Sequence, residues 1–193
     1  MPTARWSAAH RSDGTRAVAD RTSDRKLDAD LDAGIDQAWG VLEQVAKWIV
    51  HAEGKASLII ASAGVIGGVL FSVVNGRQLD LATACFAWLS AALILASGLC
   101  AAVSLWPRVG RSREPVSLLY FGEIARRYPD SPAPYAEALT ALLRQPDRLA
   151  EQIATQIWAN SLVAARKFRW ANIGLGVLIG ALLALGLTCA LLV

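Results

Sequence analysis

Very few side chains in this sequence have the types and the spacing that catalysis requires. The two histidines, His10 and His51, lie far apart, and the patterns HExxH, CxxC and GxSxG do not occur. The stretch GKAS at 54–57 resembles the end of a phosphate-binding loop. Such a loop needs a glycine five residues before Gly54, where Ile49 stands instead. We therefore predict that the protein is not an enzyme and that it uses no cofactor.

The three cysteines do not have the pattern of a metal site or a disulfide framework. Cys85, Cys100 and Cys189 each lie inside an apolar run, their number is odd, and none of their spacings matches a metal-ligand motif. We interpret them as small apolar side chains that face lipid or neighbouring helices, and we predict no bound metal.

An acid and a base stand directly before the first long apolar run. Residues 51–60 read HAEGKASLII, so Glu53 and Lys55 precede an unbroken series of apolar side chains. Charges at such a position can simply mark the boundary between water and lipid, where a lysine extends its ammonium group toward the headgroups. They can also belong to a functional site, and the two residues alone do not decide between these readings.

A second group of candidates lies in the stretch SLLYFGEIARRY at 117–128. Its apolar residues predict a helix with one apolar face, and Gly122 inside such a helix costs roughly 1 kcal/mol relative to alanine. A glycine at this kind of position usually allows another helix or a ligand to approach closely. Arg126 and Arg127 lie far from any apolar run, which makes them candidates for binding a small anion. Packing alone is the simpler explanation of the pattern.

Three apolar runs indicate that these candidates belong to a membrane protein. The chain is 54% hydrophobic and has a mean hydropathy of +0.39, which is too apolar for an ordinary soluble domain. The runs at 56–74, 81–106 and 171–193 are each long enough to cross the hydrocarbon layer as a helix. The net charge of +3 suits juxtamembrane lysines and arginines better than a nucleic-acid surface, so we expect no nucleic-acid partner.

The remaining segments are polar and mostly have helical patterns. Residues 1–26 contain few large apolar side chains and no signal-peptide core, so we predict a disordered tail. Residues 27–55 have the apolar spacing of an amphipathic cytosolic helix. Residues 107–170 form a second cytosolic segment, with helical patterns at 115–128, 133–145 and 147–170 that prolines separate. No break separates the last pattern from the third span, which predicts one long helix.

The distribution of basic residues predicts the orientation. Eight lysines and arginines precede the first span and ten lie between the second and third spans, whereas Arg77 alone lies between the first two. Loops rich in Lys and Arg stay in the cytoplasm. We therefore expect a cytoplasmic N-terminus and an outside C-terminus. The fold class is all-α: an integral membrane protein with three transmembrane helices and a discontinuous cytosolic helical region.

Small residues recur at four-residue spacing inside two of the spans. The third span carries Gly176, Gly180 and Ala184, and the first carries Gly64 and Gly68. This spacing lets helix backbones approach closely in lipid, either within one protomer or between protomers. We expect a homo-oligomer, because three spans lined by Ala, Gly and Leu enclose no pore alone.

The order of three motifs resembles a known family. AEGKASLI leads into the first span, YFGEIARRY lies in the cytosolic segment, and QIWANSLVAARKFRWANIGL enters the last span. Over roughly residues 35–190 this pattern resembles the transmembrane effectors of Pycsar, bacterial antiphage systems built on a pyrimidine cyclase. The motif positions that match are Lys55, Ala56, Ser57, Tyr120, Phe121, Gly122, Ile124 and Lys167, while Glu53 stands where the family usually has an aspartate.

The resemblance implies an activity at the bacterial inner membrane. A partner cyclase makes a cyclic pyrimidine nucleotide, cCMP or cUMP, on infection; the effector responds to it and impairs the membrane, which causes abortive infection. A cyclic nucleotide is a monoanion with a planar base, so it needs cations and an aromatic platform. Arg126, Arg127 or Lys167 beside Tyr120 or Phe121 meet that need. The resemblance also makes Glu53 and Lys55 candidates for a hinge or a contact between helices, with Arg166 or Lys167 as a basic partner.

Two other functions fit the same elements. The protein could be a constitutive membrane scaffold that binds a partner through residues 27–50, or a channel subunit without nucleotide gating. The apolar runs contain no charged residue, and ion and substrate pathways usually place one there, which counts against a transporter or channel.

Overall fold

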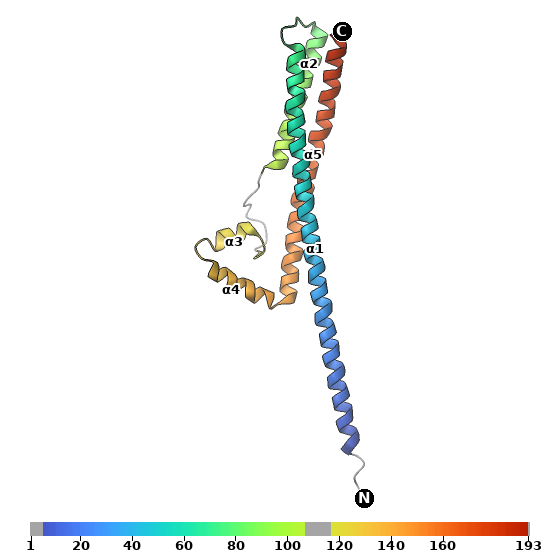
Figure 1. The fold of residues 1–193 in the computed structure, drawn as a ribbon, viewed down its shortest axis with the longest axis vertical. Helices are drawn as coiled ribbons and strands as arrows, with labels where there is room; N and C mark the ends of the chain where they lie inside the picture. The colour runs from blue at the N-terminus through green and yellow to red at the C-terminus, as the bar shows by residue number, and fades with distance from the viewer. Residues whose placement is uncertain (1–5, 107–116, 193) are drawn as a thin grey trace. The chain divides into compact units, whose positions relative to one another are not determined.

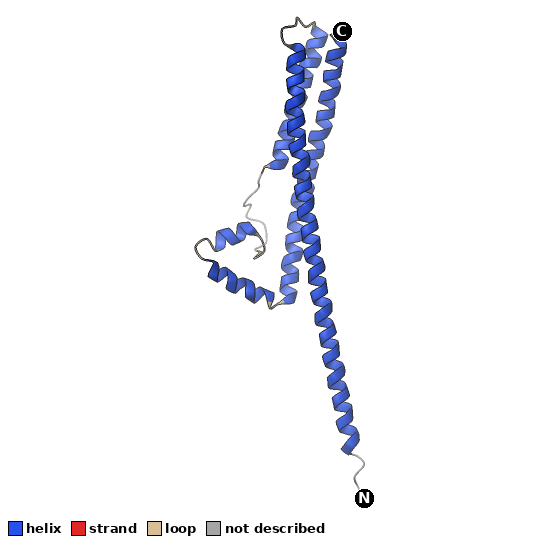
Figure 2. Cartoon of the chain, viewed as in Figure 1, coloured by secondary structure: helices blue, strands red, loops and turns tan. Residues whose placement is uncertain are grey.

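The computed structural model describes residues 6–106 and 117–192, with the backbone alone for residues 6–25, 27 and 28. Within these residues the chain folds into helices without any strand, which confirms the all-α prediction (Figure 2). The helices are α1 Trp6–Val74, α2 Leu81–Leu105, α3 Phe121–Arg127, α4 Pro132–Leu143 and α5 Pro146–Leu191. Three of them, α1, α2 and α5, contain stretches long and apolar enough to cross a membrane, as predicted.

Helix α1 begins earlier than the sequence patterns indicate. Its helical backbone starts at Trp6, whereas we predicted a disordered tail over residues 1–26, of which 1–5 lie outside the described part. Low apolar content argues against a buried core but not against a helix. No proline lies between Pro2 and Pro107, and extending an existing helix avoids the cost of a new nucleus.

The described residues divide into two compact units. The first, which we call the insert unit, contains residues 6–41 and 117–155; the second, the bundle unit, contains residues 42–106 and 156–192. Helices α1 and α5 each contribute one part to each unit. The long helix predicted from 147 into the third span is α5, and it is continuous.

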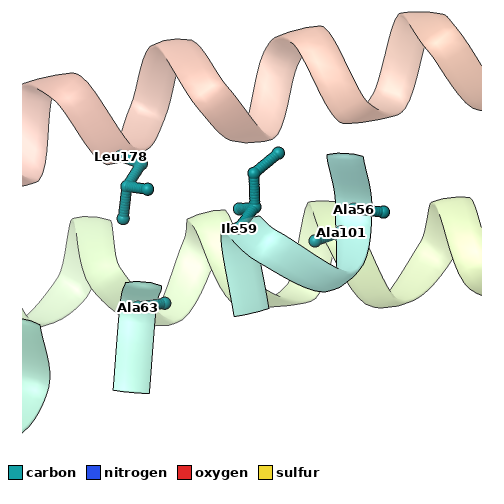
Figure 3. Close-up of a cluster of buried hydrophobic side chains, with 5 residues drawn as sticks. All are labelled: Ala56, Ile59, Ala63, Ala101 and Leu178. Atoms are coloured by element: carbon teal, nitrogen blue, oxygen red, sulfur yellow. The ribbon is translucent and has the colours of Figure 1, made fainter. Parts of the chain in front are cut away.

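Three helices pack side by side in the bundle unit (Figure 1). One buried cluster joins Ile59 of α1, Ala101 of α2 and Leu178 of α5, with Ala56 and Ala63 beside them (Figure 3). A second cluster joins Leu70, Ala87 and Leu185 of the same three helices. From the first cluster to the second the numbers rise in α1 and α5 and fall in α2. Helices α1 and α5 are therefore parallel, and α2 runs antiparallel to both.

The buried face of α1 has the spacing of a coiled coil. Val45, Ala52 and Ile59 are buried seven residues apart, and so are Ala56, Ala63 and Leu70. Two seven-residue series offset by three or four residues form one seam along a helix that packs lengthwise on its neighbours. The seam passes through residues 51–55 without interruption, so the charged threshold lies inside a straight helical segment rather than at a helix end.

The outer surface of the bundle carries large apolar side chains. Within the predicted spans, examples with exposed fractions between 66% and 77% are Leu58, Val65, Phe71, Trp88, Leu95 and Leu183. A soluble bundle rarely exposes so many large apolar side chains, whereas lipid chains solvate them. The protein is thus a multi-pass membrane protein.

The short loop between α1 and α2 has clear turn and capping signals. Gly76 has a φ of +74°, a conformation that glycine adopts without strain. Asp80 is the N-cap of α2: its carboxylate accepts from the Ala82 N–H at 3.2 Å and from the Thr83 hydroxyl. The Thr83 hydrogen bond lowers the pKa of the Asp80 carboxyl.

One helix of the insert unit, α3, is shorter than predicted. The sequence predicts a helix over 115–128, whereas α3 covers only Phe121–Arg127. Side chains satisfy the backbone just before it: the Leu118 N–H donates to Gln152 Oε1 at 3.0 Å, and the Leu118 carbonyl accepts from the Tyr135 hydroxyl at 3.3 Å. Because these groups have partners outside a helix, the chain stays irregular until Tyr120.

Candidate functional site

An ion pair links two of the predicted residues across the bundle. Lys167 Nζ of α5 lies 2.7 Å from Glu53 Oε1 of α1, although the two residues are 114 positions apart. The Lys167 side chain is 14% exposed and that of Glu53 is 40% exposed. A pair with one largely desolvated partner is less screened than a surface pair. Of the two basic partners that we considered, the structure has Lys167 in contact, whereas Arg166 makes no ion pair in the part of the chain described.

Lys167 also contacts the third helix of the bundle. The Ser104 hydroxyl of α2 donates to the Lys167 carbonyl at 3.0 Å. On the α1 side, the Ser57 hydroxyl donates to the Glu53 carbonyl at 3.0 Å. The three helices thus converge at Lys167, whose ammonium group binds α1 and whose carbonyl binds α2. We did not predict Ser104 as a site residue, although its seven-residue spacing from Ser97 was visible in the sequence.

Lys55 has an aromatic partner instead of an acid. Its ammonium nitrogen lies 5.5 Å from the centroid of the Phe168 ring, and the His51 ring lies 6.2 Å from the same ring. An ammonium group over a ring face is attracted by the ring quadrupole. Lys55 therefore contributes a second contact between α1 and α5, next to the Glu53–Lys167 pair. Among the described residues no carboxylate lies within ion-pair distance of Lys55.

The reason for a glycine at 122 lies in its own neighbour. A Cβ atom at Gly122 would lie 2.7 Å from Cε1 of the Tyr120 ring, closer than real Cβ contacts. The rings of Tyr120 and Phe121 have centroids 4.8 Å apart at 54°. The glycine thus lets the Tyr120 ring fold over the first turn of α3, a packing contact within the segment itself.

The two predicted arginines of α3 differ in their partners. Arg126 donates to both carboxylate oxygens of Glu123, at 2.9 and 2.7 Å, so its charge is already balanced within the helix. Arg127 makes no ion pair within the part of the chain that the structure describes. Of this pair, Arg127 is the better placed to bind an added anion.

The eight predicted ligand and gating residues fall into two groups. Tyr120, Phe121, Gly122, Arg126 and Arg127 belong to the insert unit, and Glu53, Lys55 and Lys167 belong to the bundle unit. The second group already forms a connected set of contacts.

The small residues of the spans also divide into two classes. Ala184 is buried, and a Cβ at Gly180 would lie 3.6 Å from Leu93 of α2, so both pack within the protomer. Gly64, Gly68 and Gly176 have no atom within 4 Å of the corresponding position. The closest glycine contact between spans lies at Gly174, which we did not predict: its Cβ would lie 3.4 Å from Cys100 Cβ and from the Ser97 carbonyl oxygen.

Comparisons with known proteins identify the family. The model of the PycTM family, described as the Pycsar effector protein domain, matches residues 37–193. The Pycsar effector protein PtPycTM of Propioniciclava tarda is 36% identical over 155 residues, which cover 79% of this chain and 74% of the relative. No solved structure matches. The match confirms the predicted resemblance: this chain belongs to the PycTM family of Pycsar effectors and is a membrane protein of antiphage defence.

Proposed function

We propose that this effector responds to a cyclic pyrimidine mononucleotide, cCMP or cUMP, made by a partner cyclase, and then impairs the bacterial inner membrane. The observation that carries the proposal is the continuity of α5. This one helix contributes residues 146–155 to the insert unit and then, in the bundle unit, carries Lys167 and the third span. A ligand that moves the start of α5 would therefore act on the same helix that carries the ion pair to α1.

The insert unit offers the groups that such a ligand needs. Arg127, which makes no ion pair among the described residues, supplies a guanidinium for the phosphate, and Tyr120 and Phe121 supply aromatic faces for the base. A second aromatic pair in the same unit joins Tyr128 to Tyr135 of α4, with ring centroids 5.6 Å apart. Arg126 can join only by exchanging Glu123 for the phosphate, which would make binding depend on that rearrangement.

Hydrogen bonds connect this surface to α5. The segment just before α3 is held by Gln152 of α5 through the Leu118 N–H, and by Tyr135 of α4 through the Leu118 carbonyl. A ligand shifts an equilibrium only by its difference in affinity for the two states. A nucleotide that prefers a different position of residues 118–127 would therefore change the position of Gln152 on α5 as well.

The Glu53–Lys167 pair is the proposed gate of the resting state. It joins α1 to α5 at the predicted entry to the membrane, and the Lys55–Phe168 contact lies beside it. Displacement of α5 would separate the pair and release α1. In the proposed topology the N-terminus is cytoplasmic and the C-terminus is on the opposite side of the membrane. The reason is that eight lysines and arginines precede the first span and ten lie between the second and third spans, and such segments stay in the cytoplasm.

A homo-oligomer completes the proposal. Gly64 and Gly68 of α1 and Gly176 of α5 are exposed, with open space where a side chain would stand. Glycines four apart on a lipid-facing helix favour close contact with a second helix. One protomer has only three spans, so several copies are needed to surround a pore or to disturb the bilayer.

Dye release from proteoliposomes tests the response. Purified protein is reconstituted into vesicles with a self-quenched dye, and cCMP, cUMP, cAMP or cGMP is added. We expect release with a cyclic pyrimidine nucleotide and little with the purine controls. If no cyclic mononucleotide changes dye release, nucleotide gating is rejected and a constitutive scaffold or channel subunit is favoured.

A pair of arginine variants tests the ligand site in the same assay. Arg127→Gln is expected to raise the nucleotide concentration needed for release, because a charge-assisted contact to the phosphate is lost. Arg144→Gln is the matched control, since it removes a charge at the end of α4 in the same unit. Equal responses of the two variants would exclude Arg127 from the site.

A further inference from the structure

All hydroxyl side chains of α2 lie on one seam. The helix has four serines and threonines, at positions 83, 90, 97 and 104, seven residues apart, and all four are at most 2% exposed. A residue every seven positions stays on one side of a helix that packs lengthwise against another. The remaining surface of α2 is apolar, so its hydroxyl groups are concentrated where it meets its neighbour.

Three of these hydroxyls donate to backbone carbonyls of α5. Ser90 Oγ lies 3.0 Å from the Ala181 carbonyl oxygen, Ser97 Oγ lies 2.8 Å from that of Gly174, and Ser104 Oγ lies 3.0 Å from that of Lys167. The acceptors are also seven residues apart and descend as the donors ascend. We call these three hydrogen bonds the serine ladder; they have the register of one antiparallel pair.

The ladder is unlike the other hydroxyl contacts of the long helices. The hydroxyls of Ser57, Ser161 and Thr188 each donate to a carbonyl four residues earlier in their own helix. That bond is available to any serine in a helix and does not depend on a neighbour. The three ladder serines bond across to α5 instead. In hydrocarbon no water can replace such a partner, so separation of α2 from α5 leaves polar groups unsatisfied.

Close backbone contact accompanies the middle of the ladder. A Cβ at Gly174 would lie 3.4 Å from both the Ser97 carbonyl oxygen and Cys100 Cβ. A side chain at this position would therefore be in van der Waals contact with α2, so the α5 and α2 backbones lie close together beside the Ser97 hydrogen bond. Hydrogen bonds with fixed donors and acceptors, unlike apolar packing, specify one axial register.

Helix α1 is attached to the other two helices in a different way. Along the predicted span it contacts them through apolar residues such as Ile59, Ala63 and Leu70. In the described part of the bundle, Glu53 with Lys167 is the sole side-chain hydrogen bond or ion pair between α1 and either neighbour. Apolar contacts have no direction, so they permit sliding and rotation far more readily than a hydrogen-bond ladder does.

We infer that α2 and α5 move as one body and that α1 is the helix that is displaced when the effector acts. Lys167 contacts both α2 and α1. Its carbonyl accepts the Ser104 hydrogen bond of the serine ladder, and its ammonium group donates to Glu53. The displacement of α1 on activation rests on the proposed function, because it assumes that a nucleotide gates the effector. The rigidity of the α2–α5 pair does not rest on it and can be measured alone.

Two engineered disulfides test the role in activation. Gly174→Cys pairs with the native Cys100 across α2 and α5, where the Cβ separation of 3.4 Å is close to that of a disulfide. Gly67→Cys with Ile94→Cys joins α1 to α2, because a Cβ at Gly67 would lie 3.7 Å from Ile94 Cγ2. All other cysteines are replaced by alanine, and the loss of maleimide-reactive thiols reports closure. Each single-cysteine variant, oxidised in the same way, is the matched control.

Dye release is compared before and after reduction. We expect the oxidised α2–α5 variant to release dye with nucleotide as its reduced form does. The oxidised α1–α2 variant is expected to fall to the level of protein-free vesicles and to recover on reduction. Loss of release in both variants would show that α2 and α5 must separate, and retention in both would show that α1 need not move. Either result, or the reverse pattern, overturns the inference.

A measurement without nucleotide separates this inference from the proposed function. Spin labels at Leu99 and Leu183 report the α2–α5 distance, and labels at Val65 and Leu183 report the α1–α5 distance; all three side chains are exposed. In lipid nanodiscs we expect a narrower distance distribution for the α2–α5 pair. Replacing Ser90, Ser97 and Ser104 by alanine should broaden it, whereas alanine at the exposed Ser62 and Ser72 of α1 should not. An α2–α5 distribution as broad as that of α1–α5 refutes the rigid pair, whatever the nucleotide does.

Discussion

Lys167 and Glu53 form an ion pair of 2.7 Å between α5 and α1 at the predicted entry to the membrane. The same lysine accepts a hydrogen bond on its carbonyl from Ser104 of α2, so one residue connects all three helices of the bundle. The threshold charges are therefore part of an inter-helix contact and not only markers of the lipid boundary. Their function as a gate remains our proposal.

Removing one member of the pair should bias the effector toward its active state. We expect Lys167→Met to raise nucleotide-independent dye release, because Glu53 then loses its partner at the α1–α5 contact. The double variant Glu53→Lys with Lys167→Glu should restore resting behaviour. A double-mutant cycle should give a coupling of roughly 1 kcal/mol, about fivefold in the equilibrium. Arg166→Met is the control, and additive effects of Glu53 and Lys167 changes would contradict a functional pair.

Single steps of the serine ladder should contribute modestly to stability. Ser97→Ala leaves the Gly174 carbonyl without its inter-helix donor, and such bonds in membrane proteins contribute on average about 0.6 kcal/mol and at most about 1.7 kcal/mol. Unfolding in mixed micelles measures the change. Ser62→Ala, at an exposed position of α1, should be neutral. A larger effect at Ser62 than at Ser97 would contradict the assignment.

Gly122 should not tolerate alanine. The added methyl group would lie 2.7 Å from the Tyr120 ring, so the ring must leave its position over α3. We expect a loss of about 1–3 kcal/mol in the stability of the insert unit, typical of overpacking, together with a weaker nucleotide response. Gly34→Ala is the matched control, since nothing lies within 4 Å of its Cβ position. Circular dichroism melting distinguishes the two, and equal melting temperatures would show that Tyr120 moves at no cost.

Because Asp80 caps α2, the free energy of unfolding should vary with pH in the acidic range. The Thr83 hydrogen bond lowers the folded-state pKa of Asp80 below its usual 3.8. A depressed carboxyl pKa stabilises the fold above the unfolded pKa, and this contribution is lost as pH falls through the folded pKa. Asp80→Asn keeps a capping side chain but cannot titrate. We expect the wild type to have a higher free energy of unfolding than this variant above pH 3.8 and to lose this excess below pH 3.8. A difference in free energy that stays constant across that range would reject the assignment.

The exposed glycines of α1 should matter only between protomers. Gly64→Ile with Gly68→Ile is expected to reduce oligomers in bilayers, measured by energy transfer between labelled copies, because bulky side chains prevent close helix contact. Both positions have open space within the protomer, so the fold itself should be kept. Gly186→Ile, also exposed and without a neighbour, is the control. Unchanged energy transfer in the double variant would place the interface elsewhere.

Local properties of the sequence were sufficient to predict much of the protein. Apolar run length predicted the three spanning helices, and the unbroken stretch from 147 onward predicted the continuous α5. Motif order predicted the family. Polar composition was misleading for residues 6–26, because it indicates whether a segment has a core and not whether it is helical. It was also insufficient before α3, where side chains of α4 and α5 hold Leu118 outside the helix.

The tertiary structure decided which residues meet. The sequence left Arg166 and Lys167 as equal partners for Glu53, and the rotation of α5 against α1 selects Lys167. The sequence also displayed serines at 90, 97 and 104, but their function as a ladder depends on carbonyls 63 to 91 positions away in an antiparallel register. Hydropathy and capping act within a few turns of one helix, whereas register and rotation between helices arise only when all three pack together.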